Sequence, residues 1–423
     1  MPQHILSLII MGVIVFLFVT RLIPLSVTAM LGAAAMAGAG IITVGEVFAS
    51  FYCDAVLLIL GTIVLGNTLT ETGCTDLIGN TIMRVPGIGK SERLFVIVTV
   101  SAVVFLSAFI SNTATVAIFL PLVAGIAKTS AGTISKKNTY MAVGIASILG
   151  GNLTLAASTP QIVAQGILIQ TEGCKPMGFF DLTKGAIPLI LVMLIYFSTA
   201  GYPLQKKTFR FDESGVPDGG VEKARAGKRK AVIAGLIFLA CVVGFVTEAA
   251  SLGVVAILAA CACMLTGCIS VKRAAKTMDW TAIFVLGGSL GFSKGLARSG
   301  ALQMMADSII AMLGPAATPF MVLAALVVLT TFVGNFMSST AAAAIVVPIA
   351  VTVAMGLGSN PTTFAVGVVI ACSLSIATPV STPPLTMTLA GGYRFSDYVV
   401  VGGALSILCM AVALTTLPLL YGL

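Results

Sequence analysis

The two halves of the chain share one motif: FLSAFISNTATVAIFLPLVAGIA at residues 105–127 and TFVGNFMSSTAAAAIVVPIAVTVA at residues 331–354. The copies are offset by 227 residues, so that Ser111 aligns with Ser338. In each copy a polar triplet interrupts an apolar run, which predicts two short helices that meet at the triplet. In an apolar chain, broken segments in corresponding halves are the best sequence pointer to the central site of a transporter.

A second pair of polar breaks follows the first. Ser158-Thr159-Pro160 in the first half aligns with Ser381-Thr382-Pro383 in the second, at an offset of 223 residues. Proline beside small hydroxyl residues interrupts a helix. Each half is therefore predicted to contain a broken helix as well as a hairpin. The four breaks are expected to meet near the middle of the bilayer.

The composition excludes a soluble globular domain. Hydrophobic residues make up 58% of the chain and charged residues 9%, with a mean hydropathy of +1.10, whereas ordinary domains are about a quarter charged. Apolar runs long enough to cross a bilayer recur throughout. The first, residues 5–19, lacks a charged leader and a cleavage site before Arg21, so we interpret it as a retained helix and not a signal peptide.

The apolar runs predict an all-α polytopic membrane protein made of two inverted repeats. The segments 93–128 and 317–356 are too long for one crossing and break at their middles, so each is predicted as a re-entrant hairpin. Five crossings remain in each half. Because an odd number of crossings ends on the opposite side of the membrane, the second half starts from that side and has inverted topology. The expected crossings are 5–20, 24–42, 53–72, 138–170, 184–204, 231–248, 251–268, 280–299, 361–392 and 398–421.

The positive charges predict one orientation. With the N-terminus outside, 19 of the 23 basic residues fall on the inner side, as the positive-inside rule requires. Both termini are then outside a cell inner (plasma) membrane, and residues 205–230 form a cytoplasmic linker. The net charge of +8 follows from this topology, so the charge does not indicate nucleic-acid binding.

The first hairpin tip, Ser111-Asn112-Thr113, offers the chemistry of an ion site. Hydroxyl and amide groups beside helix ends suit a carboxylate oxygen or a sodium ion. No basic residue is near either tip in the sequence, so anion binding would depend on neutral donors and helix N-termini. The single histidine is His4, and without a nucleophile–base pair we expect neither an enzyme nor an organic cofactor.

Four stretches carry a resemblance to a known family: RLIPLSVTAML (21–31), LLILGTIVLGNTLTETG (57–73), the Ser-Asn-Thr tip, and TPPLTMTLAGGYRFSDYVVVG (382–402). With these, nearly the whole chain resembles the divalent anion:sodium symporter family, the dicarboxylate, citrate and sulfate carriers of the ion transporter superfamily. The resemblance implies a homodimer in a lipid bilayer, in which substrate crosses between the two tips by an elevator movement.

The resemblance also implies a division of each repeat into scaffold and transport helices. The first repeat covers 1–204, with scaffold 1–92 and transport helices 93–204. The second covers 231–423, with scaffold 231–310 and transport helices 317–423.

The site residues follow from the same resemblance. Substrate contacts are expected from Asn112, Thr113, Ser339, Thr340, Thr159, Pro160, Thr382 and Pro383. A first sodium site is expected from Ser107, Ser111, Asn112 and Gly151, and a second from Ser338 and Thr378.

The second half departs from the first at its cation position. The offset aligns Ser107 with Gly334 and Asn112 with Ser339, so two side-chain donors are lost or shortened. The preferred interpretation is a secondary active transporter of a small dianion, a C4-dicarboxylate or related carboxylate, coupled to sodium. The alternatives are a sodium-independent carboxylate exchanger of the same fold and, less favoured because the hairpins lack carboxylates, a cation/proton antiporter.

Overall fold

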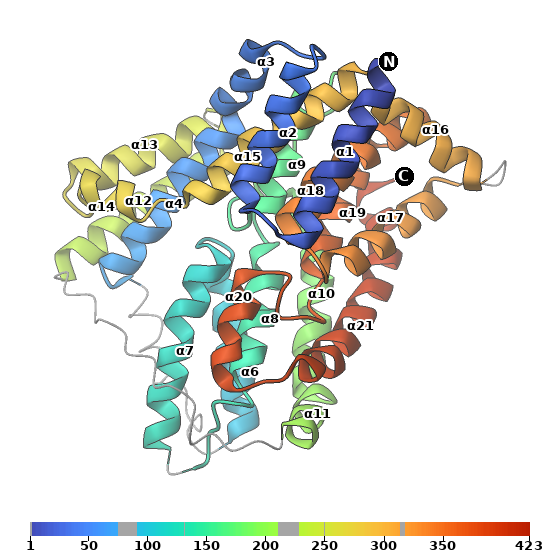
Figure 1. Cartoon of the computed structure of the whole chain (residues 1–423). Coiled ribbons are helices and arrows are strands. Elements are labelled where there is room, and N and C mark those ends of the chain that lie inside the picture. Colours follow the sequence, from blue (N-terminus) through green and yellow to red (C-terminus); the bar gives the residue numbers. More distant parts are fainter. Residues whose placement is uncertain (1, 75–90, 131, 210–227, 249, 314–317) are drawn as a thin grey trace.

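The structure is a computed structural model that describes residues 2–74, 91–130, 132–209, 228–248, 250–313 and 318–423. Throughout these ranges the regular elements are helices, with no strand among them (Figure 1). The expected all-α class is therefore confirmed. The expected linker 205–230 lies largely outside the described residues.

The elements of the first half are α1 (Gln3–Thr20), α2 (Leu25–Gly38), α3 (Val44–Ala49), the 3-10 turn η1 (Ser50–Tyr52), α4 (Asp54–Glu71), α6 (Glu92–Ser107), α7 (Asn112–Thr129), α8 (Tyr140–Gly151), α9 (Thr159–Gln170), α10 (Asp181–Ser198) and α11 (Gly201–Thr208). Those of the second half are α12 (Lys228–Val246), α13 (Leu252–Leu265), α14 (Val271–Lys276), α15 (Trp280–Arg298), α16 (Ala301–Leu313), α17 (Pro319–Gly334), α18 (Ser339–Gly356), α19 (Pro361–Ser373), α20 (Pro383–Thr388), the turn η2 (Leu389–Gly391) and α21 (Phe395–Tyr421).

The helix bounds repeat with the sequence motif. Adding 227 to the bounds of α2, α3, α6 and α7 gives the bounds of α13, α14, α17 and α18. The two predicted hairpins are therefore the pairs α6–α7 and α17–α18. The two predicted broken helices are α8 with α9 and α19 with α20, separated by polar residues at the expected positions.

The packing of the repeats is reciprocal. Helix α2 packs against α15 while its counterpart α13 packs against α4, the counterpart of α15. In the same way α18 packs against α9, and α7 packs against α20. Such exchanged contacts are what a two-fold axis between the halves produces. In Figure 1 the hairpin α6–α7 lies in the lower part of the molecule and α17–α18 in the upper part, as expected for inverted halves.

Within the residues that the structure describes, six helices are long and apolar enough to cross a membrane: α1, α4, α10, residues 229–246 of α12, α18 and α21. The chain is thus a multi-pass membrane protein. One of the six, α18, is an arm of a hairpin that the sequence predicted as re-entrant. Its 18 residues would span about 27 Å.

The last expected crossing of the first half has different bounds in the structure. The expected segment was 184–204, but α10 ends at Ser198 and α11 follows from Gly201 to Thr208. The chain turns so tightly that a Cβ added to Gly201 would lie 2.6 Å from the Tyr196 ring. Residues 205–208 of the expected linker are the last turn of α11.

Helices of the two halves approach closely where glycine faces backbone. A Cβ added to Gly61 would lie 2.3 Å from the backbone carbon of Ala256, and one added to Gly288 would lie 2.7 Å from that of Ala29. The two contacts are equivalent under the offset of 227, because Gly61 aligns with Gly288 and Ala29 with Ala256. Small residues of this kind let membrane helices pack backbone to backbone.

Two ion pairs join the halves in the same reciprocal way. Glu71 pairs with Arg273, and Glu46 pairs with Arg298. Under the offset, Glu46 aligns with Arg273 and Glu71 with Arg298, so the first half carries both acids and the second both bases. The pKa of Glu46 is lowered, first by hydrogen bonds from the Thr43 backbone and hydroxyl and then by the charge of Arg298.

We expect the charge reversal Glu71→Arg to lower the melting temperature, because it faces Arg273 with a like charge. The loss is modest, about 1 kcal/mol, since both side chains are partly exposed. Adding Arg273→Glu restores the pair and should recover most of the loss, which a double-mutant cycle of melting temperatures measures.

The matched control combines Glu71→Arg with Arg298→Glu. This variant has the same net charge as the rescued one, but it leaves both pairs, at Arg273 and at Glu46, with like charges. If it recovers stability as well as the true swap does, the ion pairs contribute nothing and only the overall charge matters.

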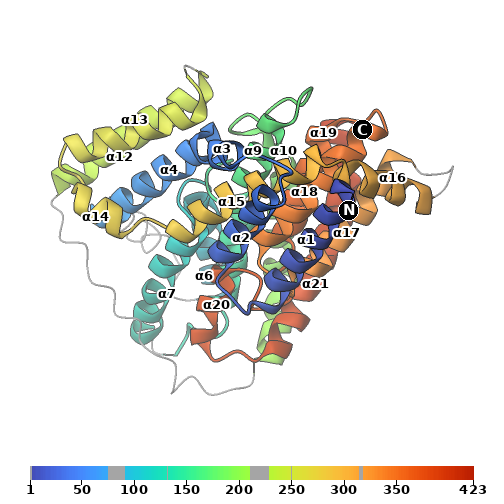
Figure 2. The ribbon, with the colours of Figure 1, turned by 45° about the horizontal axis from the view of Figure 1, so that its top comes forward.

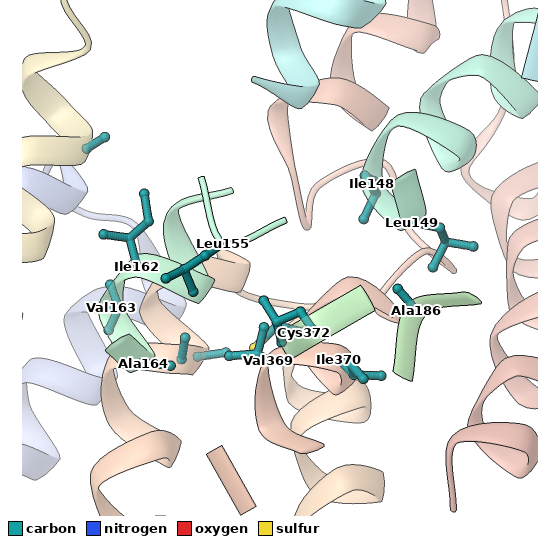
Figure 3. Close-up of a cluster of buried hydrophobic side chains, with 14 of the residues drawn as sticks. Ile148, Leu149, Leu155, Ile162, Val163, Ala164, Ala186, Val369, Ile370 and Cys372 are labelled. Atoms are coloured by element: carbon teal, nitrogen blue, oxygen red, sulfur yellow. The ribbon is translucent and has the colours of Figure 1, made fainter. Parts of the chain in front are cut away.

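One part of the hydrophobic core lies where the broken helices of the two halves meet. Figure 3 shows buried side chains of α8, α9, α10 and α19 packed around this crossing. The labelled residues are Ile148, Leu149, Leu155, Ile162, Val163, Ala164, Ala186, Val369, Ile370 and Cys372. In Figures 1 and 2 alike, α12 and α13 lie on one flank, beside α4 and away from this core. This part of the core therefore holds the polar breaks in place, and α4, α13 and α15 pack beside it as part of the same hydrophobic cluster.

Candidate functional site

Each hairpin turns at its predicted tip because the first arm ends and a hydroxyl residue starts the second. In the first half α6 ends at Ser107, and Ser111 caps α7 by accepting a hydrogen bond from the Ala114 N–H at 3.3 Å. In the second half α17 ends at Gly334, and Ser338 precedes α18. The predicted breaks are thus real, and each leaves the N-terminus of a helix at the tip.

Both tips and both broken helices line one cavity of about 490 Å³. Every residue that the sequence predicted as a substrate contact is part of its wall: Asn112, Thr113, Thr159, Pro160, Ser339, Thr340, Thr382 and Pro383. The remaining wall comes from α4, the start of α15 and Leu25 of α2. The fold therefore brings together four segments that are widely separated along the chain.

The cavity presents helix N-termini and neutral hydrogen-bonding groups. Helices α7, α9 and α18 begin at the wall residues Asn112, Thr159 and Ser339, and their partial positive charge favours an anion. The described wall residues include no lysine or arginine. The Thr382 hydroxyl is buried at this wall and has no partner within the described part of the chain. It is therefore a donor available to a ligand.

The sequence reasoning missed several polar wall residues, among them Asn67 and Asp279. The Asn67 side chain donates to the Thr277 carbonyl at 3.0 Å, and the Asp279 carboxylate accepts from the Ala282 N–H at 3.0 Å. Both belong to the wall formed by α4 and α15. An amide inside an apolar helix was a usable signal for Asn67. Asp279 had none, because it resembles an ordinary helix N-cap.

A basic residue lies closer to the breaks than the sequence indicated. The Arg21 guanidinium, between α1 and α2, donates to the Val380 carbonyl at 2.8 Å. Val380 directly precedes Ser381 of the cavity wall. Val380 belongs to the second broken helix and not to a hairpin tip, so the expectation that no base lies near either tip is not affected. The contact joins residues 359 positions apart in the sequence, which meet only in the folded chain.

The first tip gathers oxygen atoms behind the cavity. The Ser107 hydroxyl lies 2.8 Å from Asn112 Oδ1 and 2.7 Å from the Ser147 carbonyl oxygen. Gly151 fits directly against Asn112, since an added Cβ would lie 2.3 Å from Asn112 Oδ1. Three of the four residues expected at the first sodium site thus lie together. The fourth, Ser111, lines the cavity beside them.

These oxygens suit a hard cation. They are neutral hydroxyl, amide and carbonyl groups, the ligand types that hard ions prefer over nitrogen or sulfur. The Gly151 carbonyl, however, already accepts a hydrogen bond from the buried Gln161 amide at 2.9 Å. A carbonyl oxygen has a second lone pair, so this hydrogen bond does not exclude Gly151. The oxygens that lie directly together are those of Ser107, Asn112 and the Ser147 carbonyl.

The two residues expected at the second sodium site are used differently. Ser338 lines the cavity. The Thr378 hydroxyl instead donates to the Asn335 carbonyl. Asn335, directly after α17, also accepts from the Ala377 N–H at 2.9 Å through its side chain. The second tip is thus held by internal hydrogen bonds.

Comparison with known proteins gives a consistent result. A protein-family model described as "Citrate transporter" matches residues 15–366 and 242–422. An uncharacterised transporter of Haemophilus influenzae is 28% identical over 440 residues, covering 98% of this chain and 91% of that protein. The sodium-dependent dicarboxylate transporter SdcS of Staphylococcus aureus is 24% identical over 411 residues, covering 89% and 78%.

The fold also resembles a solved structure. The YdaH transporter of Alcanivorax borkumensis superposes with a TM-score of 0.67 at 14% sequence identity, covering 89% of this chain and 86% of that one. At this identity the likeness concerns the fold alone.

Proposed function

The chain belongs to the citrate transporter family, and from this premise we propose that it carries a small dianion, a C4-dicarboxylate or related carboxylate, together with sodium. The protein is a secondary transporter of the citrate/dicarboxylate type and not an enzyme. The resemblance to the divalent anion:sodium symporters is thereby confirmed at the level of the family.

The observation that carries the proposal is the meeting of four broken segments at one cavity. Three helix N-termini and several hydroxyl groups face it, which suits carboxylate oxygens. Its volume of about 490 Å³ lies within the range of small-molecule sites. We assign substrate contacts to Asn112, Thr113, Thr159 and Pro160 of the first half and to their counterparts Ser339, Thr340, Thr382 and Pro383.

Sodium coupling is supported by the oxygen cluster behind the first tip. A cation among Ser107, Asn112 and the Ser147 carbonyl would lie beside the C-terminus of α6, whose partial negative charge favours it, and would offset the repulsion between dianion and Asp279. The distant relative SdcS is named as sodium-dependent. Because Asn112 belongs to both the oxygen cluster and the cavity wall, it can link cation and substrate binding.

We further propose an elevator movement, in which the hairpins and broken helices slide past α4 and α15. The cavity lies against the C-terminal half of α4, the half that carries Glu71, and against the first turns of α15. Away from that end, an added Cβ on Gly166 of α9 would lie 2.8 Å from the Leu290 side chain of α15. A cysteine cross-link between positions 166 and 290 should therefore stop uptake, and unimpaired uptake would refute the movement.

The orientation and assembly remain part of the proposal. The positive charges indicate an inner membrane, outside termini and a cytoplasmic linker at 205–230, which places the Glu71 end of the cavity toward the cytoplasm. The family resemblance implies a homodimer. Thiol labelling of Cys261, which is exposed near the end of α13, tests the sidedness, and the mass of the purified protein tests the dimer.

The runner-up is a sodium-independent exchanger of two carboxylates. It is favoured by Gly334 and Ser339, which leave the second half with fewer donors than Ser107 and Asn112 give the first. A cation/proton antiporter is the weaker alternative. The described hairpin helices carry one acid, Glu92, which lies at the far end of α6 from the tip.

Uptake of radiolabelled succinate into proteoliposomes tests the proposed function. With an inward gradient of sodium, and with choline in its place as control, we expect accumulation in empty vesicles only with sodium. The sodium gradient supplies the driving force, so no internal substrate is needed.

Two other results would lead elsewhere. Uptake that requires succinate-loaded vesicles and ignores sodium identifies the exchanger. If succinate is not carried under any condition, the C4-dicarboxylate assignment is wrong, and citrate, tartrate and sulfate are tested in the same assay.

A further inference from the structure

The chain leaves α1 and its counterpart α12 through nearly the same four residues. Residues 18–21 read Phe-Val-Thr-Arg and residues 245–248 read Phe-Val-Thr-Glu, at the repeat offset of 227. The local hydrogen bonds are also the same. The Thr20 hydroxyl donates to the carbonyl four positions earlier at 2.8 Å, and the Thr247 hydroxyl does so at 2.9 Å. The repeat therefore presents side chains of opposite charge at two equivalent positions.

Both charged residues have a left-handed backbone. Arg21 has a φ of 53° and Glu248 a φ of 49°, and among the described residues these are the two positive values outside glycine. The Arg21 N–H donates to the Leu17 carbonyl at 3.0 Å, so Arg21 occupies the position after a helix where glycine is usual. A left-handed backbone is unfavourable for a residue with a side chain. A charged side chain at both positions therefore indicates a role that outweighs this cost.

The proposed scaffold helices, α1–α4 and α12–α16, contact the hairpins and broken helices through apolar side chains. The ring centroids of Phe109 and Phe238 are 5.2 Å apart, and those of Phe179 and Phe245 are 4.2 Å apart. Hydrophobic contact is not directional. Such contacts can be exchanged for others when one surface slides along another, so they do not select one position of the moving helices.

The Arg21 side chain makes a directional contact across the same boundary. Its guanidinium donates to the Val380 carbonyl at 2.8 Å. Between described residues, the other side-chain hydrogen bond that crosses the boundary joins Gln170 and Ser50 at 3.5 Å, which is too long to be strong. A charge-assisted hydrogen bond is short and depends on geometry, so the Arg21 contact stabilises one position of the second broken helix.

The repeat places the equivalent of this contact on the other side of the membrane. In the proposed topology α1 starts outside and α12 starts in the cytoplasm, so Arg21 lies on the cytoplasmic side and Glu248 on the outer side. The offset of 223 between the broken helices aligns Val380 with Ala157, which precedes Ser158. The Glu248 side chain is exposed in this conformation and has no hydrogen bond or ion pair with another described residue. One contact of the pair is thus made, and the other is not.

The two breaks differ in the way that the two charges require. A guanidinium only donates hydrogen bonds and a carboxylate only accepts them, and the second break offers Arg21 a carbonyl. At the first break, the Ser158 hydroxyl precedes α9 without capping it, so it is available as a donor. The N-terminus of α9 also favours a negative charge. The first break therefore suits the carboxylate of Glu248.

We infer that Arg21 and Glu248 stabilise the two end states of transport in turn. Arg21 holds the second broken helix at Val380 in the conformation of this structure, in which the cavity lies toward the Glu71 end. Glu248 holds the first broken helix at Ser158 in the opposite conformation. The inference rests on the proposed elevator movement and names the contacts that limit it at each end.

Cysteines at 166 and 290 measure the population of the present conformation, because these positions are in contact in it. The readout is the rate of cross-link formation in proteoliposomes with sodium and succinate on both sides. Arg21→Gly should change the ratio of the two conformations about tenfold, equivalent to about 1.4 kcal/mol, and slow the cross-link. Glu248→Gly should accelerate it, and the double variant should return toward the wild-type rate.

Glycine suits a left-handed backbone, so neither substitution should lower the melting temperature. The control is Lys272→Gln, which removes an exposed base from α14 and should leave the rate unchanged. Single variants that change the rate in the same direction, or not at all, overturn the inference. If the cross-link itself fails to stop uptake, the elevator movement is wrong and the inference fails with it. A cross-link that stops uptake but forms equally fast in every variant contradicts only the roles of Arg21 and Glu248.

Discussion

Asn112→Ala is expected to reduce sodium-driven uptake about a hundredfold, equivalent to about 2.8 kcal/mol. Asn112 is the first residue of α7, and its Oδ1 lies 2.8 Å from the Ser107 hydroxyl. It also lines the cavity. Alanine removes the acceptor-only oxygen of the cation position and a polar group of the cavity wall in one step. The measurement is the initial rate of succinate uptake at equal amounts of reconstituted protein.

The loss should be one of transport and not of folding. Asn112 packs against Gly151, so alanine relieves contact and creates no clash. The control is Asn360→Ala, which removes an asparagine that caps α19 away from the cavity. Asn360→Ala should transport normally. Near-normal uptake by Asn112→Ala would remove Asn112 from the site, and equal losses in both variants would indicate a general defect.

Gly61→Val is expected to prevent the protein from folding, and Gly288→Val should do the same. A side chain at Gly61 would meet the backbone of Ala256, and one at Gly288 the backbone of Ala29. Backbone cannot rotate away as a side chain can, so α4 and α13, or α15 and α2, would have to separate. Overpacking within a core costs about 1–3 kcal/mol, and clashes with backbone exceed that range. The yield of monodisperse protein after size-exclusion chromatography measures the effect.

The matched control is Gly12→Val on α1. An added Cβ on Gly12 meets nothing within 4 Å, so the same substitution should leave yield and uptake unchanged. Gly61→Val and Gly288→Val should behave alike, because the two contacts are equivalent in the repeat. If only one of them prevents folding, the contacts α4–α13 and α15–α2 do not contribute equally to stability, and the prediction is wrong.

Most of the candidate site could be predicted from the sequence because polar breaks are rare in an apolar chain. A hydroxyl or amide at bilayer depth needs a partner, so Ser111-Asn112-Thr113 and Ser158-Thr159-Pro160 stood out. Their recurrence at a nearly constant offset then paired them with segments of the second half. All predicted substrate residues line one cavity for this reason.

Contacts between distant segments could not be predicted in this way. Nothing in the sequence around Ser375, Arg21 or Asp279 indicates their contacts. Ser375 resembles any serine of an apolar segment, Arg21 a basic residue in a loop, and Asp279 an ordinary helix N-cap. Ser375 acquires a meaning only because its hydroxyl lies where a side chain of Gly334 would be. The end of α10 at Ser198 was missed for a related reason, because the turn there depends on how Gly201 packs against Tyr196.

By itself, the sequence determined the membrane class, the inverted repeat and the four polar breaks. These depend on hydrophobicity and on helix-breaking residues, which act over a few neighbouring positions. Only the tertiary structure decided which oxygens share a proton, which position is filled by Ser375, and that the acids of one half face the bases of the other. Such pairings depend on distances between residues of different helices, and no spacing along the chain specifies those distances.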